Sequence, residues 1–339
     1  MAIFLSLLYL TRPDSIYYIG LICMFLAISS LKPLKLDFRF LAPFGIFFVT
    51  FLGHTTFRYH YYGELIPNTV LLKVVNFPFS IRIETGLYFV SKYLLESIVI
   101  LLVSAASIIY PSKRPQKFIF LVFIWATIFY QIYVGGDAWD YWRFFVPIFP
   151  LIMILFFSTV GEVFSDCFIS KPWLRYVLSI LIFIVGFSAY NWQFFKELTL
   201  SEPPYQVVYN EDNVNYALRM EDFLSEGGRV AVFWAGAIPY YTDYYFIDIL
   251  GKMDKKIASR DIYINKKADF GKRTVPGHNK FDLKYSLIEL DPDVAQNVSW
   301  MNQNIGGSPG FDFESYRYKG KEYWVRKKSL NVDFVQLSR

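Results

Sequence analysis

Long apolar stretches separated by short polar segments fill the chain up to residue 192. An α-helix rises about 1.5 Å per residue, so about 20 apolar residues cross the hydrocarbon core of a bilayer. The pattern predicts spans at residues 15–30, 39–57, 88–110, 118–134, 144–163 and 175–192. A further apolar stretch over residues 1–10 is about half a span long and ends at Thr11-Arg12-Pro13-Asp14. We therefore expect residues 1–192 to form an α-helical polytopic membrane domain with about six to seven spans.

The remaining residues, 193–339, have shorter apolar runs and more charge. Apolar side chains recur at helical spacing over 211–225, which predicts a helix. The runs that predict buried strands lie at 229–234, 246–250, 285–290 and 323–326. Strands that alternate with helices are typical of an α/β layer, so we expect residues 193–339 to form one soluble α/β domain.

Composition supports a membrane protein. Charged residues make up 19% of the chain, whereas a soluble domain carries about a quarter, which argues against a single soluble globule. The aromatic content of 20% excludes a disordered chain, and two cysteines exclude a disulfide-built scaffold. Residues 1–192 hold 14 Lys and Arg against 9 Asp and Glu, whereas residues 193–339 hold 20 of each. The net charge of +5 therefore belongs to the apolar part, where loop charges orient a membrane protein.

The predicted loops alternate in charge. The basic residues of three loops are Lys32, Lys35, Arg39, Lys113, Arg114, Lys117, Lys171 and Arg175. Between these loops lie residues 58–87 and 135–143, which carry both signs. The positive-inside rule places the basic loops in the cytoplasm. We expect a multi-pass protein of the cell membrane whose loops 58–87 and 135–143 and C-terminal domain are extracytoplasmic.

The first candidate site follows the predicted span 39–57. The substrate-binding candidates there are Arg58, His60, Tyr61, Tyr62, Glu64, Asn68 and Lys73. Tyrosines suit the hydroxyls and ring faces of a sugar, and a helix starting at Asn68 would direct backbone amides toward an anion. The alternative is an interfacial aromatic belt with a few charges that reach to the membrane surface.

The second candidate site is the loop 135–143. Two glycines at its start permit the backbone to approach a ligand closely. Asp137 and Asp140 are suited to a divalent cation or a sugar hydroxyl, and Arg143 is suited to a phosphate. The alternative is a plain outer loop in which Asp140 and Arg143 pair with each other.

A third candidate is Arg12, because a charge at a broken helix near membrane depth usually lines a cavity. Other classes of site have little support. The chain has three histidines and no HExxH, GxSxG, paired CxxC or Walker motif. We therefore assign no cofactor, and the only metal considered is a divalent cation at Asp137 and Asp140. His60 and Glu64 are two ligand types at i,i+4, a weak zinc signal. No pattern of a nucleic-acid module is present.

Several short motifs together indicate a family. They are Tyr61-Tyr62-Gly63 with Leu65, Pro67-Asn68-Thr69 and Lys73; Gly135-Gly136-Asp137 with Arg143-Phe144; Leu10-Thr11-Arg12-Pro13-Asp14; Gly236-Ala237-Ile238-Pro239-Tyr240-Tyr241; Ile247-Asp248 with Gly251; and Gly277-His278 with Lys280. In this order, over nearly the whole chain, they resemble the polytopic GT-C glycosyltransferases of the terminal β-arabinofuranosyltransferase family.

The resemblance implies transfer of a sugar, with inversion, from a polyprenyl-phosphate donor to a cell-envelope glycan. In that family the base is an aspartate in the first outer loop, which takes the acceptor proton, while basic groups or a metal meet the charge of the leaving phosphate. The family's arginine-proline step comes after several spans, whereas here it comes at Arg12. We therefore expect the base to lie outside this chain, the catalytic residue to be unassigned within it, and the chain alone to be inactive.

Our interpretation is a GT-C-like membrane glycosyltransferase whose partners are the lipid-linked donor, the glycan acceptor and the bilayer. Arg58, Lys73 and Arg143 are the candidates for the lipid phosphate, and Asp137, Glu64 and the tyrosines for sugar hydroxyls. The alternative is a non-catalytic transporter or envelope assembly protein with a periplasmic domain. A transporter needs polar residues deep in several spans, whereas the middles of 39–57, 118–134 and 144–163 are almost entirely apolar.

Overall fold

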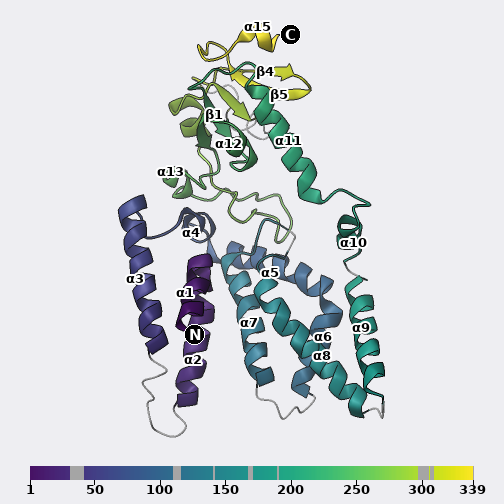
Figure 1. Cartoon of the computed structure of the whole chain (residues 1–339). Helices are drawn as coiled ribbons and strands as arrows, with labels where there is room; N and C mark the ends of the chain where they lie inside the picture. The colour runs from purple at the N-terminus through teal and green to yellow at the C-terminus, as the bar shows by residue number, and fades with distance from the viewer. Residues whose placement is uncertain are drawn as a thin grey trace. The chain divides into compact units, whose positions relative to one another are not determined.

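The computed structural model describes residues 1–30, 42–109, 116–139, 142–166, 171–188, 191–296, 305 and 309–338. Its N-terminal region is mostly helical, and its C-terminal region combines a mixed five-stranded sheet with helices (Figure 1). The chain divides into two compact units. The first contains Met1–Pro67 and Arg114–Thr127, and the second contains Asn68–Lys113 and Ile128–Arg339.

The first unit is helical. Its helices are α1 (Ala2–Thr11), α2 (Ile16–Ser30), α3 (Ala42–Tyr62) and the start of α7 (Gln116–Val134). Between α1 and α2, Arg12 has an extended backbone and a single 3₁₀ turn, Pro13–Ser15, follows. Proline fixes its own φ and lacks an N–H, which suits it to the start of this turn. Tyr9 of α1 is buried and its hydroxyl lies 3.0 Å from Nδ1 of His54 on α3, which holds α1 against α3.

The other helices of the N-terminal region belong to the second unit, where the end of α7 and the start of α8 (Phe149–Asp166) flank the short connection that carries the candidate site. They are α4 (Asn68–Lys73), α5 (Phe79–Glu96), α6 (Ile98–Ile109), the end of α7, α8, α9 (Pro172–Ser188) and α10 (Trp192–Leu198). A 3₁₀ turn, Val146–Ile148, leads into α8. Helices α6 and α8 pack together, and the Ser104 hydroxyl donates to the Ile152 carbonyl at 3.2 Å. The predicted span 88–110 is divided between α5 and α6, which meet at a bend of 86°.

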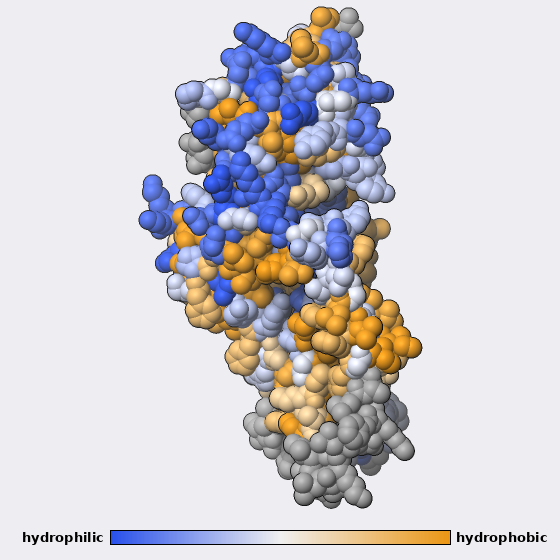
Figure 2. All heavy atoms as spheres, turned by 90° about the vertical axis from the view of Figure 1, so that its left-hand side faces the viewer, coloured by the Kyte–Doolittle hydropathy of each residue, from blue (hydrophilic) through white to orange (hydrophobic). Residues whose placement is uncertain are grey.

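Two helical segments are long and apolar enough to cross a membrane, Lys117–Val134 and Val146–Asp166. The number within the described residues rises to four if two helix pairs, α5 with α6 and α9 with α10, each count as one span. Hydrophobic residues predominate over the helices, whereas hydrophilic residues cover much of the C-terminal region (Figure 2). By length and composition, the described residues thus contain two to four candidate membrane spans, which indicates a membrane protein.

The C-terminal region contains a sheet with strand order β2-β1-β3-β5-β4. The strands are β1 (Arg229–Val232), β2 (Tyr245–Asp248), β3 (Val294–Gln296), β4 (Phe313–Tyr318) and β5 (Lys321–Arg326). Strand β1 pairs in parallel with β2 and β3, and β5 pairs antiparallel with β3 and β4. The helices of this region are α11 (Tyr205–Met220), α12 (Ala237–Tyr241), α13 (Lys255–Ala258) and α15 (Phe334–Leu337).

Alternation along the strands creates a hydrophobic core on each face of the sheet. Val230 and Val232 of β1 pack into one core together with Tyr216 of α11, whereas Ala231 packs into the other. The predicted strands 229–234, 246–250 and 323–326 are confirmed with small shifts of their ends.

The predicted strand at 285–290 is wrong, because Tyr285–Glu289 forms a helical turn. Its apolar residues belong to the core through Leu287, and periodicity alone does not separate a short buried helix from a strand. The helix predicted at 211–225 begins earlier, at Tyr205, and ends at Met220. Strands β3 and β4 were not predicted, since β3 has three residues and β4 is largely polar.

Candidate functional site: cations around a buried aspartate

The site is organised by the turn that follows α7. Gly135 and Gly136 have φ of 85° and 75°, in the left-handed region that favours glycine. A Cβ added at Gly136 would lie 2.6 Å from Cβ of Phe89 on α5, so this position accepts only glycine without a shift of its neighbour. The turn presses the next residue against the helices, and the Asp137 side chain is only 3% exposed.

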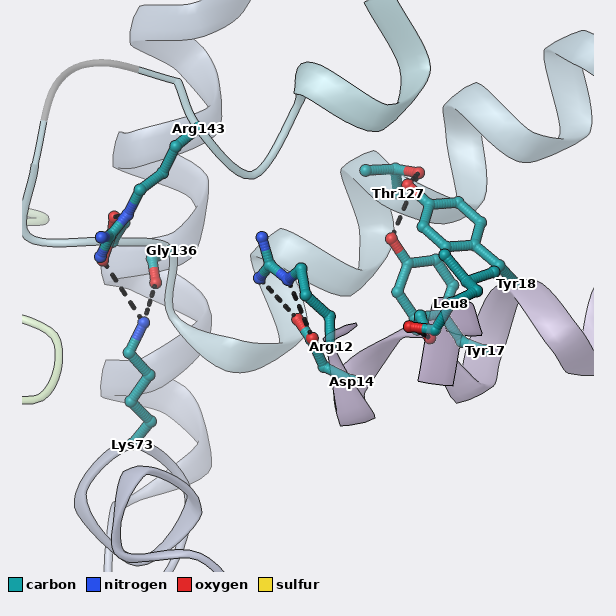
Figure 3. A network of polar contacts seen from close by, with 11 residues as sticks. Leu8, Arg12, Asp14, Tyr17, Tyr18, Lys73, Thr127, Gly136 and Arg143 are labelled. Carbon is teal, nitrogen blue, oxygen red and sulfur yellow. Dashed lines mark hydrogen bonds and ion pairs between the residues drawn. The ribbon is translucent and has the colours of Figure 1, made fainter. Parts of the chain in front are cut away.

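Two cations share the buried carboxylate of Asp137. Arg143 donates from Nε to Oδ2 at 2.7 Å and from Nη2 to Oδ1 at 3.1 Å. Nζ of Lys73 donates to the Gly136 carbonyl at 3.2 Å and lies 3.5 Å from Oδ1 of Asp137. Figure 3 shows the Lys73 and Arg143 side chains pointing toward one another. Because a bidentate arginine–carboxylate pair fixes both distance and plane, Asp137 holds Arg143 in one orientation.

The cluster keeps a positive charge and an open side. Of the described residues 135–139 and 142–144 together with Lys73, the cations Lys73 and Arg143 contact one carboxylate, Asp137. The Arg143 side chain is 56% exposed although its partner carboxylate is buried, so part of the guanidinium faces outward. The Phe144 ring lies 4.9 Å from Nζ of Lys73 and 5.1 Å from Cζ of Arg143, a distance at which aromatic rings attract cations.

Lys280 of the C-terminal region fixes the helix that carries Lys73. Its side chain is fully buried, and Nζ donates to the carbonyls of Leu71 at 2.9 Å, Val75 at 2.7 Å and Ala258 at 3.0 Å. The last carbonyls of a helix have no partner inside it, so an ammonium group there satisfies groups around the end of α4. Burial lowers the pKa of Lys280.

Helix α5 is tied to the same part of the C-terminal region. Glu84 accepts from the Gly271 backbone N–H at 2.8 Å and pairs with Nη1 of Arg273 at 3.5 Å. The hydroxyls of Thr85 and Thr274 lie 2.9 Å apart and both residues are buried. Residues 252–281 therefore lie on α4 and α5, which brings two further side chains to the cluster.

Those side chains are Lys252 and His278. Nδ1 of His278 lies 3.0 Å from the Pro276 carbonyl, which only accepts, so Nδ1 carries the proton and Nε2 accepts from Nζ of Lys252 at 3.0 Å. Burial, followed by the charge of Lys252, lowers the pKa of His278 to about 4, so the ring is neutral at pH 7. Burial also lowers the pKa of Lys252. Asp248 shapes the turn that carries Lys252 by accepting from the backbone of Leu250 and Met253.

One tryptophan borders the histidine, and a second tryptophan packs against the first. Trp139 of the loop after α7 lies 5.8 Å from Trp234 and 6.0 Å from the His278 ring, centroid to centroid. Trp234 follows β1, where its backbone N–H and that of Phe233 donate to Gln296 Oε1. Ligands of open α/β sheets usually bind beyond the carboxyl ends of parallel strands, and Trp234 lies there.

The structure brings together three of the predicted site residues, Lys73, Asp137 and Arg143. Asn68 begins the helix that ends at Lys73, and its Nδ2 donates to the Lys252 carbonyl at 3.3 Å. Asp140 lies outside the described residues. Both oxygens of Asp137 contact cationic side chains of the protein, and no group of three or more His, Cys, Asp or Glu suited to a metal occurs in the described part of the chain.

The remaining predicted residues belong to the first unit. Arg12 donates to Asp14 from Nε at 3.1 Å and from Nη2 at 2.9 Å, which pairs the two charges at the helix break (Figure 3). The residues at the end of α3 and just after it are Arg58, His60, Tyr61, Tyr62 and Glu64. Their tyrosines are 70% and 64% exposed, and the Tyr61 ring stacks on Phe57 at 5.4 Å.

Sequence reasoning did not assign Lys252, Trp139 or Trp234 to the site. His278 and Lys280 entered only as part of the family's tail pattern. Lys252 gives no local signal, since it follows a strand and a glycine in a region rich in lysine. Its role is visible only when the fold places it beside His278, 26 positions away.

Comparison with known proteins adds one match. No curated protein and no solved structure matches the chain. Residues 201–317 match a domain family described as a domain of unknown function, DUF8728. The matched segment contains Lys252, His278 and Lys280, whereas Lys73, Asp137 and Arg143 precede it.

Proposed function

We propose that this chain supplies the donor-binding cluster of a GT-C-type membrane glycosyltransferase, in which the cluster around Asp137 holds the phosphate of a polyprenyl-phosphate sugar donor and the acceptor is a cell-envelope glycan. The observation that carries the proposal is the placement of the cluster. Asp137 follows one candidate span, Lys117–Val134, and Arg143 precedes the next, Val146–Asp166. A phosphate carried on a lipid chain lies where spans end, so its negative charge would meet the cations Lys73 and Arg143 of this cluster. The proposed topology has six to seven spans, with the cluster and the C-terminal region extracytoplasmic.

The chemistry of the transfer needs a cationic site. The bond between the anomeric carbon and the phosphate oxygen breaks, and its electron pair goes to the phosphate, which gains a negative charge. The acceptor oxygen forms the new bond to that carbon and gives up its proton to a base, which is not assigned among the residues of this chain. Preoriented cations lower the energy of such a charge as it develops, because they need no reorganisation at that moment. Arg143 and Lys73 are preoriented by their contacts with Asp137 and Gly136.

The charge balance favours an anion over a metal ion as the ligand of this cluster. The Asp137 carboxylate contacts two cations, so its capacity to bind a divalent cation is already engaged. The exposed part of Arg143 and the adjacent Lys252 present donors rather than acceptors. The aromatic rings of Trp139 and Trp234 next to the cluster suit the apolar face of a sugar ring.

The proposal is tested in cells whose chromosomal gene carries Arg143→Met, because donor and acceptor are then both native. We expect the pool of polyprenyl-phosphate-linked sugar to rise and one sugar linkage to disappear from the envelope glycan, measured by lipid extraction and linkage analysis. The matched control is Arg317→Met, since Arg317 is exposed on β4. An unchanged pool and glycan in the Arg143 variant would refute the proposal and would favour a transporter or an envelope assembly protein.

A further inference from the structure

The short helix α10 has an apolar face that is largely uncovered. Successive residues of a helix are rotated by about 100°, so Trp192, Phe195 and Leu198, spaced by three, share one face. The side chains of Trp192 and Leu198 are 64% and 63% exposed, so the described residues leave most of their surface open. Phe194, at the edge of this face, is 49% exposed. Several large apolar side chains thus lie together on a helix of seven residues.

The opposite face of α10 is polar, and its lysine is paired. Gln193, Lys196 and Glu197 recur there at spacings of three and four. Nζ of Lys196 lies 2.8 Å from Oε1 of Glu202, and Nε2 of Gln193 donates to Oε2 of the same carboxylate at 3.1 Å. Residues 191–202 contain one lysine and two glutamates, so this face has no excess of positive charge that would attract an anionic surface.

Helix α10 turns away from the end of α9. The Asn191 N–H donates to the Phe187 carbonyl at 3.1 Å, and the Phe187 ring lies 5.9 Å from the rings of both Phe194 and Phe195. These contacts fix α10 at the last turn of α9, and the two axes meet at 94°. With 17 residues, α9 is about 25 Å long, which is enough for a span without α10.

A second helix turns at the same level. Helix α5 meets α6 at 86°, next to Ser97. A Cβ added at Gly186, in the last turn of α9, would lie 2.7 Å from Cγ1 of Val99 in the first turn of α6, so the two bends are neighbours. Helices α6, α8 and α9 pack together, and α8 lies within the candidate span Val146–Asp166. Two helices that leave one end of a membrane bundle at right angles lie along the plane of the membrane.

We propose that α10 is an interfacial helix, which lies flat on the lipid surface and inserts Trp192, Phe195 and Leu198 among the lipids. Tryptophan is enriched at the boundary between membrane and water, and an amphipathic helix there buries its apolar face about 5–10 Å deep. Ile184 and Val185, just before the bend, are 48% and 68% exposed on a candidate span, so lipid surrounds the end of α9 as well.

Two consequences follow from this placement. Because Lys196 is paired with Glu202, apolar contacts rather than headgroup charge hold α10 on the membrane, and a zwitterionic surface is sufficient. The chain enters α11 at Tyr205, only seven residues after α10, so the anchor keeps the start of the C-terminal region at the membrane surface. The inference is independent of the proposed function, since it involves no phosphate and no sugar.

The test measures the depth of α10 in the full chain, reconstituted in phosphatidylcholine nanodiscs. Cys23 and Cys167 are replaced by alanine, and a nitroxide spin label is attached at Leu198→Cys or, as a second site on the apolar face, at Trp192→Cys. The matched control is Glu197→Cys, the adjacent position on the polar face. Oxygen concentrates in lipid and a nickel chelate stays in water, so their collision rates with the label report its depth. We expect the labels on the apolar face about 5–10 Å below the lipid phosphates and the control label in water.

Each other result would overturn the proposal. Labels in water on both faces would show that α10 does not bind the membrane, and labels deep in lipid on both faces would show that it continues the span of α9. Labels at both apolar positions that are shielded from oxygen and from the nickel chelate would indicate contact with protein, such as a second copy of the chain. Insertion that requires added phosphatidylglycerol would show that charge, rather than the apolar face, holds the helix.

Discussion

Replacement of Lys280 by methionine removes the ammonium group that joins α4 to α13. The side chain keeps a similar length and apolar character, so the main change is the loss of three hydrogen bonds of 2.7–3.0 Å. The carbonyls of Leu71, Val75 and Ala258 then lose their partner. An unsatisfied buried acceptor costs about 1–3 kcal/mol, and removing a buried charge recovers part of its desolvation cost. Taking the low end for each carbonyl gives a loss of about 3 kcal/mol.

Such a loss is measurable as local opening. In the regime where exchange follows the opening equilibrium, about 3 kcal/mol accelerates amide exchange on the order of 10²-fold. Hydrogen exchange with mass spectrometry should show this change in Asn68–Lys73 and Lys255–Ala258 and much less in the sheet. The matched control is Lys284→Met, an exposed lysine on the same segment, for which we expect a change within about 0.5 kcal/mol. Exchange in Lys280→Met that equals the wild type at α4 would refute the anchoring role.

Three further predictions concern the cluster itself. The pKa of His278 is about 4 in the folded protein and 6.5 in the unfolded chain, so the unfolded chain binds more protons between these pH values. The stability of the protein should therefore fall as the pH decreases from about 6.5 toward 4. His278→Gln should flatten this pH dependence in thermal unfolding measured over that range. Gly136→Ala should destabilise the protein by about 1–3 kcal/mol in the same assay, because the residue has a positive φ and the added Cβ would clash with Phe89. Gly161→Ala is the control and should leave the stability unchanged, because the space around its added Cβ is open. Arg143→Lys keeps the charge but loses the bidentate contact with Asp137. The turnover of lipid-linked sugar, measured in membranes from the native cells, should therefore fall about tenfold. Unchanged turnover would contradict the role of the guanidinium geometry.

The sequence predicts the parts of the fold that depend on local pattern. The apolar stretches at 118–134 and 144–163 correspond to the two candidate spans that have no sharp bend, and the buried strands at 229–234 and 246–250 are present. The bend between α5 and α6 has no such signature, since apolar residues continue across Ser97. Whether a stretch runs straight or turns depends on what packs beside it, which periodicity does not contain.

The candidate site shows the same division. Lys73, Asp137 and Arg143 could be proposed because charged residues at the ends of apolar stretches are few and costly. That Lys73 and Asp137 meet across 64 positions could not be predicted from either segment. Lys252 reaches them through the packing of residues 252–281 on α4 and α5, and this contact depends on a buried lysine and on paired threonines rather than on a local motif.

The contacts of residues 252–281 make the C-terminal region a poor candidate for independent excision. A fragment that starts after residue 192 would contain the whole of the segment 201–317 but would leave Lys280 without the carbonyls of Leu71 and Val75, and Arg273 without Glu84. The charges that join the two parts in the intact chain would then face an apolar core or water. The helices α4 and α5 and this region are consequently expected to unfold together, so that the loss of one exposes buried polar groups of the other.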